Sequence, residues 1–513
     1  MPAQVGKLLD AATAALRAGR TSEARRLARQ ALRRAPLAPP VLLVAGLAER
    51  ASGNMDRAVS LIRDAAAADP GVPAIHQHLG VTLGMAGDWA GAATAFDALV
   101  RLVPREAAAH RMLGLALQNC DRLESARAAM TRAVRLAPND PDSRHALAGI
   151  LARLGAFDDA AEAYRHALGR NPAHPSAGRE LGHLLNKMGR YADAVPLHRR
   201  ELARHPDSIE LLLELAYALA VTDGAAEAVD LLRRARVRQA RHVPLLESLA
   251  FAEMRAGDPA ACIATCDDLL AEVPDHTSAL AYKSMALNEL GRREEASFLI
   301  DTENLVHAVE LRPPDRYDGI DDFNQRLVRE LVDHPSLAYN PLNRSLRRGQ
   351  STGELFESPT GVIGDFRTMV ERAVNTYTAT HPPDRRHPFL ARRPRRWRIG
   401  CWANIMDKRG FHDVHFHPPG WLSGVYYPEV PAVVDDPNGN GQGWIEFGRA
   451  YYQFRSTDNP PVRRVKPRSG LFVMFPSWFG HRTIPVERDE RRISVAFDVM
   501  PDGPGRIVAG QER

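Results

Sequence analysis

The chain has 513 residues, of which 45% are hydrophobic and 25% charged, and its formal net charge is +5. This length predicts about two to four domains, and the near balance of acidic and basic residues does not favour nucleic acid as a partner. No stretch is apolar enough to span a membrane and the first residues lack the apolar core of a signal peptide, so we expect a cytoplasmic protein without membrane contact.

Residues 1–308 carry an internal repeat of thirty-four residues. Proline recurs at multiples of this interval, a glycine or aspartate recurs on the same register, and alanine follows five residues after nearly every one of these. The prolines are Pro36, Pro70, Pro104, Pro138, Pro172, Pro206 and Pro274, and the glycines are Gly19, Gly53, Gly87, Gly155, Gly189, Gly257 and Gly291. The pattern predicts two antiparallel helices in each unit, with glycine at the turn between them and proline at the start of the next unit.

These positions resemble the tetratricopeptide repeat (TPR), whose period is thirty-four residues. The resemblance implies stacked helix pairs that share one core and wind into a superhelix with a concave groove, which would suit a peptide or a partner protein. The alternative is that the array only holds or oligomerises the rest of the chain.

Residues 309–395 break this rhythm at Pro313 and Pro314. Segments 321–334 and 360–381 place apolar residues at three- and four-residue spacing, so each predicts an amphipathic helix. The segment between them is polar and rich in turn residues. We expect the two helices to pack on the outside of a C-terminal sheet.

From residue 396 onward, short apolar runs are separated by proline, glycine and asparagine, which predicts an all-β barrel or sandwich. The predicted strands are 396–406, 412–417, 421–430, 443–449, 470–478 and 492–500. His415 and His417 lie two apart, so on a strand their side chains leave the same face. With His481 from a distant strand they would form a facial set of three ligands that leaves positions on a metal open.

The HxH pair before SGVYY, the later LFVMFPSWFGH and the final RRISVAFD resemble the iron(II)- and 2-oxoglutarate-dependent oxygenases, specifically bacterial proteins in which TPR repeats are fused to such a domain. The resemblance implies a multidomain α plus β protein, with an N-terminal all-α TPR superhelix and a C-terminal double-stranded β-helix, or jelly roll, with supporting helices. The expected domains are a repeat array of about nine units (1–308), a linker with support helices (309–395), and the oxygenase core with its tail (396–513).

The resemblance assigns the first metal ligand to His415 and the last to His481. His417 stands where the wider superfamily usually has a carboxylate. Three ligand sets remain open: His417 completes three histidines, Asp413 supplies a carboxylate from two residues upstream of His415, or water completes the sphere.

The resemblance also implies an anchor for the distal carboxylate of 2-oxoglutarate, which a guanidinium can hold with two hydrogen bonds. Arg492 and Ser494 would supply it from one strand face, while the adjacent Arg491 points the other way. Tyr427 resembles the tyrosine that hydrogen-bonds 2-oxoglutarate in related enzymes.

The function implied is that of an Fe(II) dioxygenase with 2-oxoglutarate as co-substrate, which hydroxylates a peptidyl or protein-bound substrate recruited by the TPR groove. Two other readings stay open. The chain could be a non-catalytic TPR scaffold with a degenerate β-helix domain, or a zinc-dependent enzyme, since three histidines also suit zinc.

Overall fold

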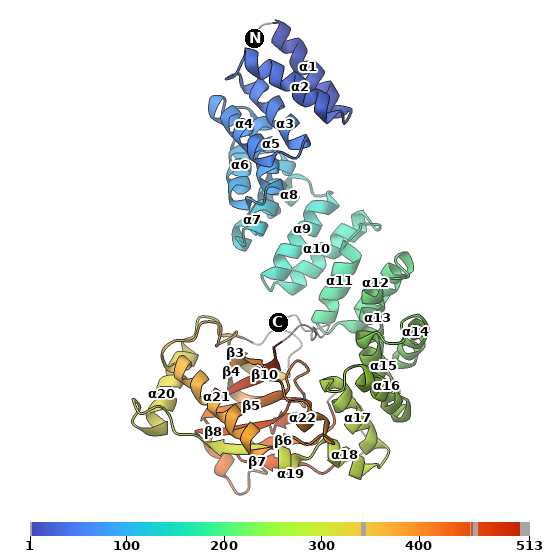
Figure 1. The fold of residues 1–513 in the computed structure, drawn as a ribbon, viewed down its shortest axis with the longest axis vertical. Coiled ribbons are helices and arrows are strands. Elements are labelled where there is room, and N and C mark those ends of the chain that lie inside the picture. Colours follow the sequence, from blue (N-terminus) through green and yellow to red (C-terminus); the bar gives the residue numbers. More distant parts are fainter. Residues whose placement is uncertain (1–2, 340–344, 452, 455–459, 503–513) are drawn as a thin grey trace. The chain divides into compact units, whose positions relative to one another are not determined.

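The computed structural model describes residues 3–339, 345–451, 453–454 and 460–502, apart from the side chains of residues 339, 407 and 408, so the predicted tail beyond residue 502 lies outside the described residues. The chain forms two compact units, residues 1–185 and 186–513. Each unit is described by itself below (Figure 1).

The first unit is a run of antiparallel helix pairs. Most helices of this unit contact the next helix in sequence, and the pairs stack, as the thirty-four-residue period predicts. Its helices are α1 (Ala3–Arg17), α2 (Thr21–Arg34), α3 (Pro39–Ala51), α4 (Met55–Ala68), α5 (Pro73–Met85), α6 (Trp89–Leu102), α7 (Ala107–Asn119), α8 (Leu123–Leu136), α9 (Pro141–Arg153), α10 (Phe157–Arg170) and α11 (Ala177–Lys187), the last of which ends just beyond the unit.

The recurring glycines lie at the turns inside each helix pair. All seven adopt φ between 69° and 83°, and Asp121, which replaces glycine in one unit, adopts φ of 59°. Residues with a Cβ atom rarely adopt this left-handed conformation, and aspartate is one of the few that does. The repeat on this register therefore has a backbone cause.

The small residues of the first helices lie where paired helices approach each other. A Cβ atom on Gly46 of α3 would lie 2.4 Å from Cγ1 of the buried Ile62 of α4 and 3.2 Å from the carbonyl oxygen of Ala58. The helix pair therefore has no room for a side chain at Gly46.

Replacing Gly46 with alanine should lower the melting temperature of the chain. Overpacking a close helix contact costs about 1–3 kcal/mol, which exceeds the gain in helix propensity of at most about 1 kcal/mol. Circular dichroism at 222 nm during heating would measure this. Gly169→Ala is the matched control, because a Cβ atom there meets no atom within 4 Å; an equal effect of both variants would refute the packing explanation.

The second unit begins with more helix pairs and ends in a β domain. Its array helices are α12 (Tyr191–Arg204), α13 (Ile209–Val221), α14 (Ala225–Arg238), α15 (Val243–Arg255), α16 (Pro259–Glu272), α17 (Thr277–Glu289) and α18 (Arg293–Leu299). The strands are β1 (His307–Glu310), β2 (Ala338–Tyr339), β3 (Leu346–Ser351), β4 (Trp397–His412), β5 (Leu422–Glu429), β6 (Ile445–Phe447), β7 (Arg463–Val465), β8 (Leu471–Pro476), β9 (His481–Thr483) and β10 (Arg492–Pro501).

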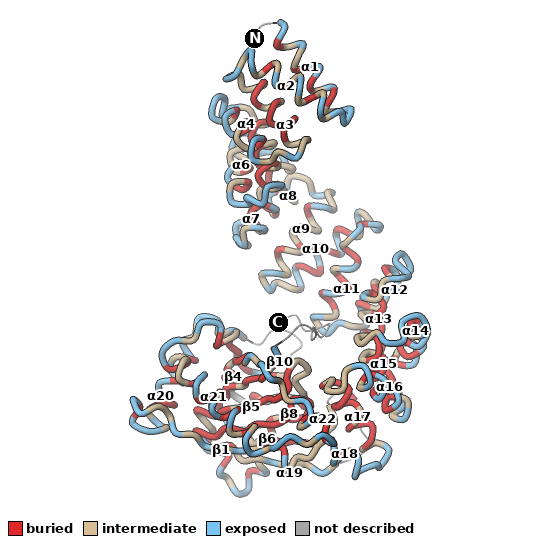
Figure 2. Tube along the Cα trace, viewed as in Figure 1, coloured by how far each residue is buried: buried red, intermediate tan, exposed pale blue. Residues whose placement is uncertain are grey.

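These strands form two antiparallel sheets. The large sheet has the order β1-β8-β5-β10-β4-β3-β2 and the small sheet the order β7-β6-β9. The central strands of the large sheet are mostly buried, as the red stretches of β5, β8 and β10 in Figure 2 show. An all-α array followed by a C-terminal antiparallel β domain confirms the predicted fold class.

Three short helices and two longer ones connect or cover the sheets in this unit. Their bounds are α19 (Thr302–Leu305), α20 (Gly319–Val332), α21 (Gly361–Thr380), α22 (Pro388–Ala391) and the 3-10 helix η1 (Ala432–Asp435). Helices α20 and α21 match the predicted segments 321–334 and 360–381 to within two residues. They pack on the large sheet: Phe366 of α21 contacts Tyr426 and Phe472, and Tyr426 donates a hydrogen bond of 2.5 Å to Asn324 of α20.

The division into compact units does not coincide with the end of the repeats at residue 308. One hydrophobic core runs from Leu212 to Val499, so the last repeats and the β domain share it. Phe251 of α15 and Tyr282 of α17 pack on Phe454, at ring-centroid distances of 5.4 and 5.6 Å. Strand β1 pairs with β8, although its first residues belong by sequence to the predicted array.

Candidate metal centre

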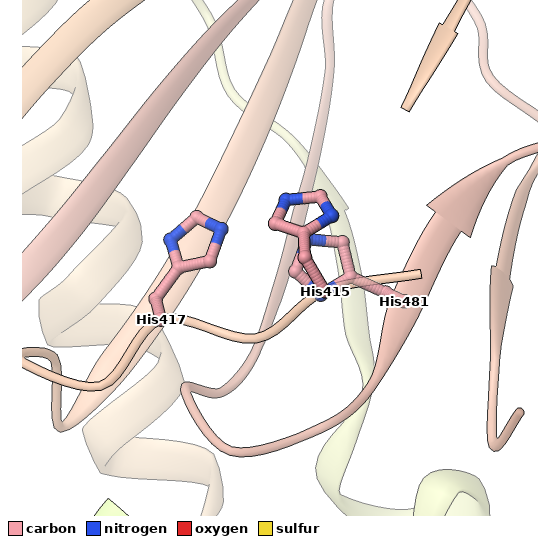
Figure 3. Close-up of side chains that lie close together, drawn as sticks. All are labelled: His415, His417 and His481. Atoms are coloured by element: carbon pink, nitrogen blue, oxygen red, sulfur yellow. The ribbon is translucent and has the colours of Figure 1, made fainter. Parts of the chain in front are cut away.

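The three histidines singled out by sequence lie together in the structure. His415 and His417 belong to the segment between β4 and β5, and His481 is the first residue of β9. One ring nitrogen of each lies within 4.8 Å of those of the other two. Figure 3 shows the three imidazoles grouped, with ring centroids 4.3 Å apart for His415 and His481 and 5.1 Å apart for the other two pairs.

The backbone holds this group from two sides. His415 and His481 exchange two backbone hydrogen bonds of 3.0 and 2.9 Å, and the backbone N–H of His417 donates to the carbonyl of Ser477. The predicted strand 412–417 is wrong, because β4 ends at His412 and only His415 forms an isolated bridge. Pro418 and Pro419 follow directly and lack the N–H groups that would continue a ladder.

Each imidazole is oriented through its Nδ1 atom. His415 Nδ1 lies 2.8 Å from the carbonyl oxygen of Asp413, His481 Nδ1 lies 2.9 Å from that of Phe479, and His417 Nδ1 lies 2.7 Å from Oδ1 of Asp498. Since a carbonyl or carboxylate oxygen only accepts, Nδ1 carries the proton in each ring. In a neutral ring of this tautomer Nε2 keeps its lone pair, which is the form in which histidine binds metals.

Burial keeps two of these rings neutral. It lowers the pKa of His415 to about 3, with charge repulsion from His417 adding to the shift. Burial likewise lowers the pKa of His481 well below its ordinary value, with further repulsion from His415 and His417. At neutral pH both rings are therefore unprotonated and able to donate a lone pair.

Asp413 contributes its backbone rather than its carboxylate to this group. Its Oδ2 accepts a hydrogen bond of 2.6 Å from Arg347, and its carboxylate is not among the converging ligand atoms. The ring of the neighbouring His412 lies 5.4 Å from the His415 ring in a tilted arrangement, and burial lowers its pKa well below the ordinary value.

The three residues predicted to anchor the co-substrate, Arg492, Ser494 and Tyr427, also lie together. Arg492 of β10 is 3% exposed, its Nη1 lies 3.4 Å from Oγ of Ser494, and its guanidinium lies 5.1 Å from the centre of the Tyr427 ring. Burial lowers the pKa of Arg492. The Arg492 guanidinium lies close enough to His412 that its positive charge also lowers the pKa of that imidazole. Arg491 points away and forms two hydrogen bonds with Glu429.

Nε of Arg492 and the hydroxyl oxygen of Tyr427 are buried, and among the described residues neither makes a hydrogen bond of ordinary geometry. Burial raises the pKa of Tyr427, while the charge of Arg492 and a hydrogen bond between the two side chains oppose this shift. Among the described residues no carboxylate forms an ion pair with Arg492. A buried guanidinium without an anion is costly. The cluster therefore fits an anionic ligand, as the three converging imidazoles fit a divalent cation.

Sequence reasoning missed Asp498 and Ser423. Asp498 lies on β10 with Arg492, Ser494 and Ala496 at two-residue spacing, so all four share one face of the strand. The signal that could have revealed Asp498 is that Arg492, Ser494 and Asp498 are three polar residues on one face of an otherwise apolar strand. Ser423, opposite Asp498 on β5, has no comparable signal.

Comparison with known families supports both parts of the chain. Residues 400–498 match the family described as "Putative 2OG-Fe(II) oxygenase". Residues 9–73, 79–141, 121–175 and 179–243 match the tetratricopeptide repeat. A search of curated proteins found no match. Within the described residues, no helix has the length and apolar character needed to cross a bilayer.

Solved structures match 31–41% of the chain. MamA (residues 41 to the end) from Desulfovibrio magneticus RS-1 is 24% identical, with a TM-score of 0.32, over 34% of this chain and 99% of that chain. PilF of Pseudomonas aeruginosa is 18% identical, with a TM-score of 0.35, over 41% and 95%. YrrB, described as a TPR protein with an unusual peptide-binding site, is 18% identical, with a TM-score of 0.32, over 36% and 94%.

The predicted fusion is confirmed by the two family matches: this chain joins tetratricopeptide repeats, within residues 9–243, to a C-terminal domain that matches the 2OG-Fe(II) oxygenase family over residues 400–498.

Proposed function

We propose that this protein is an iron(II)- and 2-oxoglutarate-dependent dioxygenase that hydroxylates a peptidyl or protein-bound substrate recruited by its TPR repeats. The observation that carries the proposal is the buried Arg492, which lacks an anionic partner among the described residues and lies on the same side of the β domain as three converging imidazoles. A cation site and an anion site side by side suit a ligand that chelates a metal at one end and carries a carboxylate at the other.

His415, His417 and His481 would hold the metal through Nε2, and three protein ligands leave the remaining positions for small molecules. Iron(II) bound there would supply the oxidation of a substrate C–H bond by dioxygen, coupled to conversion of 2-oxoglutarate to succinate and carbon dioxide. Arg492, Ser494 and the Tyr427 hydroxyl would hold the distal carboxylate of 2-oxoglutarate. In this role Nε of Arg492 and the Tyr427 hydroxyl would each gain a carboxylate oxygen as a hydrogen-bond partner.

Aromatic side chains shield the centre from water. The rings of Phe475 and Phe447 lie 4.5 and 6.0 Å from the His481 ring, and both side chains are fully buried. Exclusion of water strengthens the electrostatic contacts within the site and protects reactive species from side reactions.

Helix α17 of the repeats in the second unit contacts the segment that carries His415 and His417, which supports substrate recruitment by the array. Tyr217 of α13 stacks on Phe251 of α15, which contacts Tyr282 of α17, and Tyr282 meets Phe416 edge-on at 5.8 Å. Phe416 lies between His415 and His417 in the chain. Tyr217 is 36% exposed, so this row of rings leads from the surface of the array to the proposed ligands.

Replacing Arg492 with alanine should raise the KM for 2-oxoglutarate roughly 100-fold with little loss of bound metal. Hydrogen bonds to charged groups contribute roughly 1.5–3 kcal/mol, and each 1.4 kcal/mol is a factor of ten. Succinate formation by chain purified without oxygen and loaded with iron(II) would measure this. Arg491→Ala is the matched control, because Arg491 pairs with Glu429 on the other side of the strand.

The same preparation separates the two other readings. Metal analysis that finds zinc, with no binding of 2-oxoglutarate, would favour a zinc-dependent enzyme. A chain that binds neither metal nor 2-oxoglutarate would favour a non-catalytic scaffold. Equal KM values for wild type and Arg492→Ala would contradict the anchor assigned here.

A further inference from the structure

The carboxylate of Asp498 contacts the third candidate ligand in a way that sets this ligand apart. Its Oδ1 accepts a hydrogen bond of 2.7 Å from Nδ1 of His417 and a second of 2.6 Å from Oγ of Ser423. The Ser423 hydroxyl lies in turn 2.9 Å from that of Ser477. His415 and His481 instead contact neutral backbone carbonyl groups, so only His417 is held by a carboxylate.

Asp498 is buried, with 5% of the residue exposed. Its neighbours across the sheet are Gly400 on β4 and Ser423 on β5, neither of which carries a charge. In the described part of the chain neither lysine nor arginine pairs with Asp498, and its Oδ1 lies 2.7 Å from Nδ1 of His417. A buried carboxylate without a nearby cation is strongly unfavourable, so its presence at this position requires a source of positive charge.

A metal on Nε2 of His417 would supply that charge. Three imidazoles are neutral ligands and bring no negative charge to a divalent cation, whereas a set of two histidines and one carboxylate brings one. A carboxylate on the far nitrogen of a ligating histidine fixes its tautomer and ring orientation and raises its basicity. The carboxylate would thereby increase the electron donation from Nε2 of His417 to the metal and partly balance the charge of the metal.

We propose that Asp498 is the positioning residue of the metal centre: it orients His417 and supplies, through that imidazole, the negative charge that a directly ligating carboxylate would bring. This inference rests on the proposed function, since it requires a metal at the three histidines.

The test is titration of the full chain with Co(II) under argon, followed by the visible d–d absorption. Asp498→Asn keeps an oxygen that can accept from His417 but removes the charge. It should weaken Co(II) binding about 10- to 100-fold, the range typical of such partners, and shift the d–d bands. Glu429→Gln, which removes a surface carboxylate on β5 paired with Arg491, should change neither.

A double-mutant cycle shows whether Asp498 acts through His417. In a His417→Ala background, the further change Asp498→Asn should leave Co(II) affinity unaltered, because the imidazole that transmits the charge is gone. An additional loss equal to that in the wild-type background would overturn the proposal.

Other outcomes are equally decisive. If Asp498→Asn binds Co(II) like wild type while His481→Ala does not, the histidine metal site is supported and the proposed role of Asp498 is refuted. If Asp413→Asn weakens binding and Asp498→Asn does not, Asp413 supplies the carboxylate. If wild type binds no Co(II), both the inference and the proposed function fail.

Should Asp498→Asn not fold, proton NMR of the Zn(II)-loaded wild type decides the matter. A short N–H hydrogen bond to a buried carboxylate should give an exchange-protected imidazole resonance at low field, and His417→Ala should lack it. Absence of this resonance from the wild type would refute the hydrogen bond on which the proposal depends.

Discussion

Replacing His481 with alanine should abolish both metal binding and succinate formation. The His481 ring is the closest neighbour of the His415 ring in the candidate centre, at 4.3 Å, and only two imidazoles would remain without it. The backbone N–H and C=O of residue 481 make the two bonds to His415, and alanine keeps both. The loss should therefore come from the missing ligand rather than from a collapsed site.

Metal content after anaerobic loading with iron(II), together with succinate formation from 2-oxoglutarate, would measure this effect. Arg482→Ala is the matched control. Arg482 is the next residue of β9 and pairs with the buried Glu446, which keeps Arg449 and Arg464 as partners when Arg482 is removed. Wild-type metal content in His481→Ala would rule out His481 as a ligand.

Much of the fold could be predicted because its causes are local. Each repeat needs a left-handed turn residue and a small residue at the helix contact, and both recur visibly in the sequence, as Gly53 and Gly46 illustrate. Helices α20 and α21 have an apolar face of helical period, and the buried strands β5, β8 and β10 are apolar runs bounded by turn residues.

The edges of the sheets could not be predicted in the same way. Strand β3 reads LRRGQS and β1 reads HAVE, and neither has the apolar alternation of a half-buried strand. Both are strands because a neighbour offers an unpaired edge: β4 for β3 and β8 for β1. Pairing with a partner distant in sequence overrides weak local preference.

For the candidate site, too, local sequence features could be predicted and contacts between distant residues could not. The two-residue spacing singled out His415 and His417, since residues two apart on an extended chain lie on the same side even where no regular strand forms. His481 was assigned through the resemblance to the oxygenase sequence pattern. Neither signal could decide between His417 and Asp413 as the third candidate. That depends on which side chain Arg347 and Asp498 engage, and both of these partners lie far away in the sequence.

The last prediction concerns where the catalytic part of the chain begins. A fragment of residues 186–513 should fold and bind metal, whereas a fragment of residues 309–513 should not. The shorter fragment divides β1 and removes α15 and α17, which would expose Phe416 and Phe454. Thr277 of α17 also donates a hydrogen bond of 3.2 Å to the carbonyl of Gly420, close to the ligand segment.

The expected loss is large relative to the stability of a domain. Full exposure of a buried large apolar side chain costs roughly 1.5–3 kcal/mol, and an entire domain is stable by only about 5–15 kcal/mol. Thermal melting and Co(II) binding of both fragments would measure the difference. A third fragment, residues 300–513, restores β1 without the helices; if it folds and binds metal as well as 186–513 does, the array is not part of the catalytic unit. If it fails where 186–513 succeeds, the repeats at α15 and α17 are needed to form the metal centre, because they cover Phe416, which lies between two of its proposed ligands.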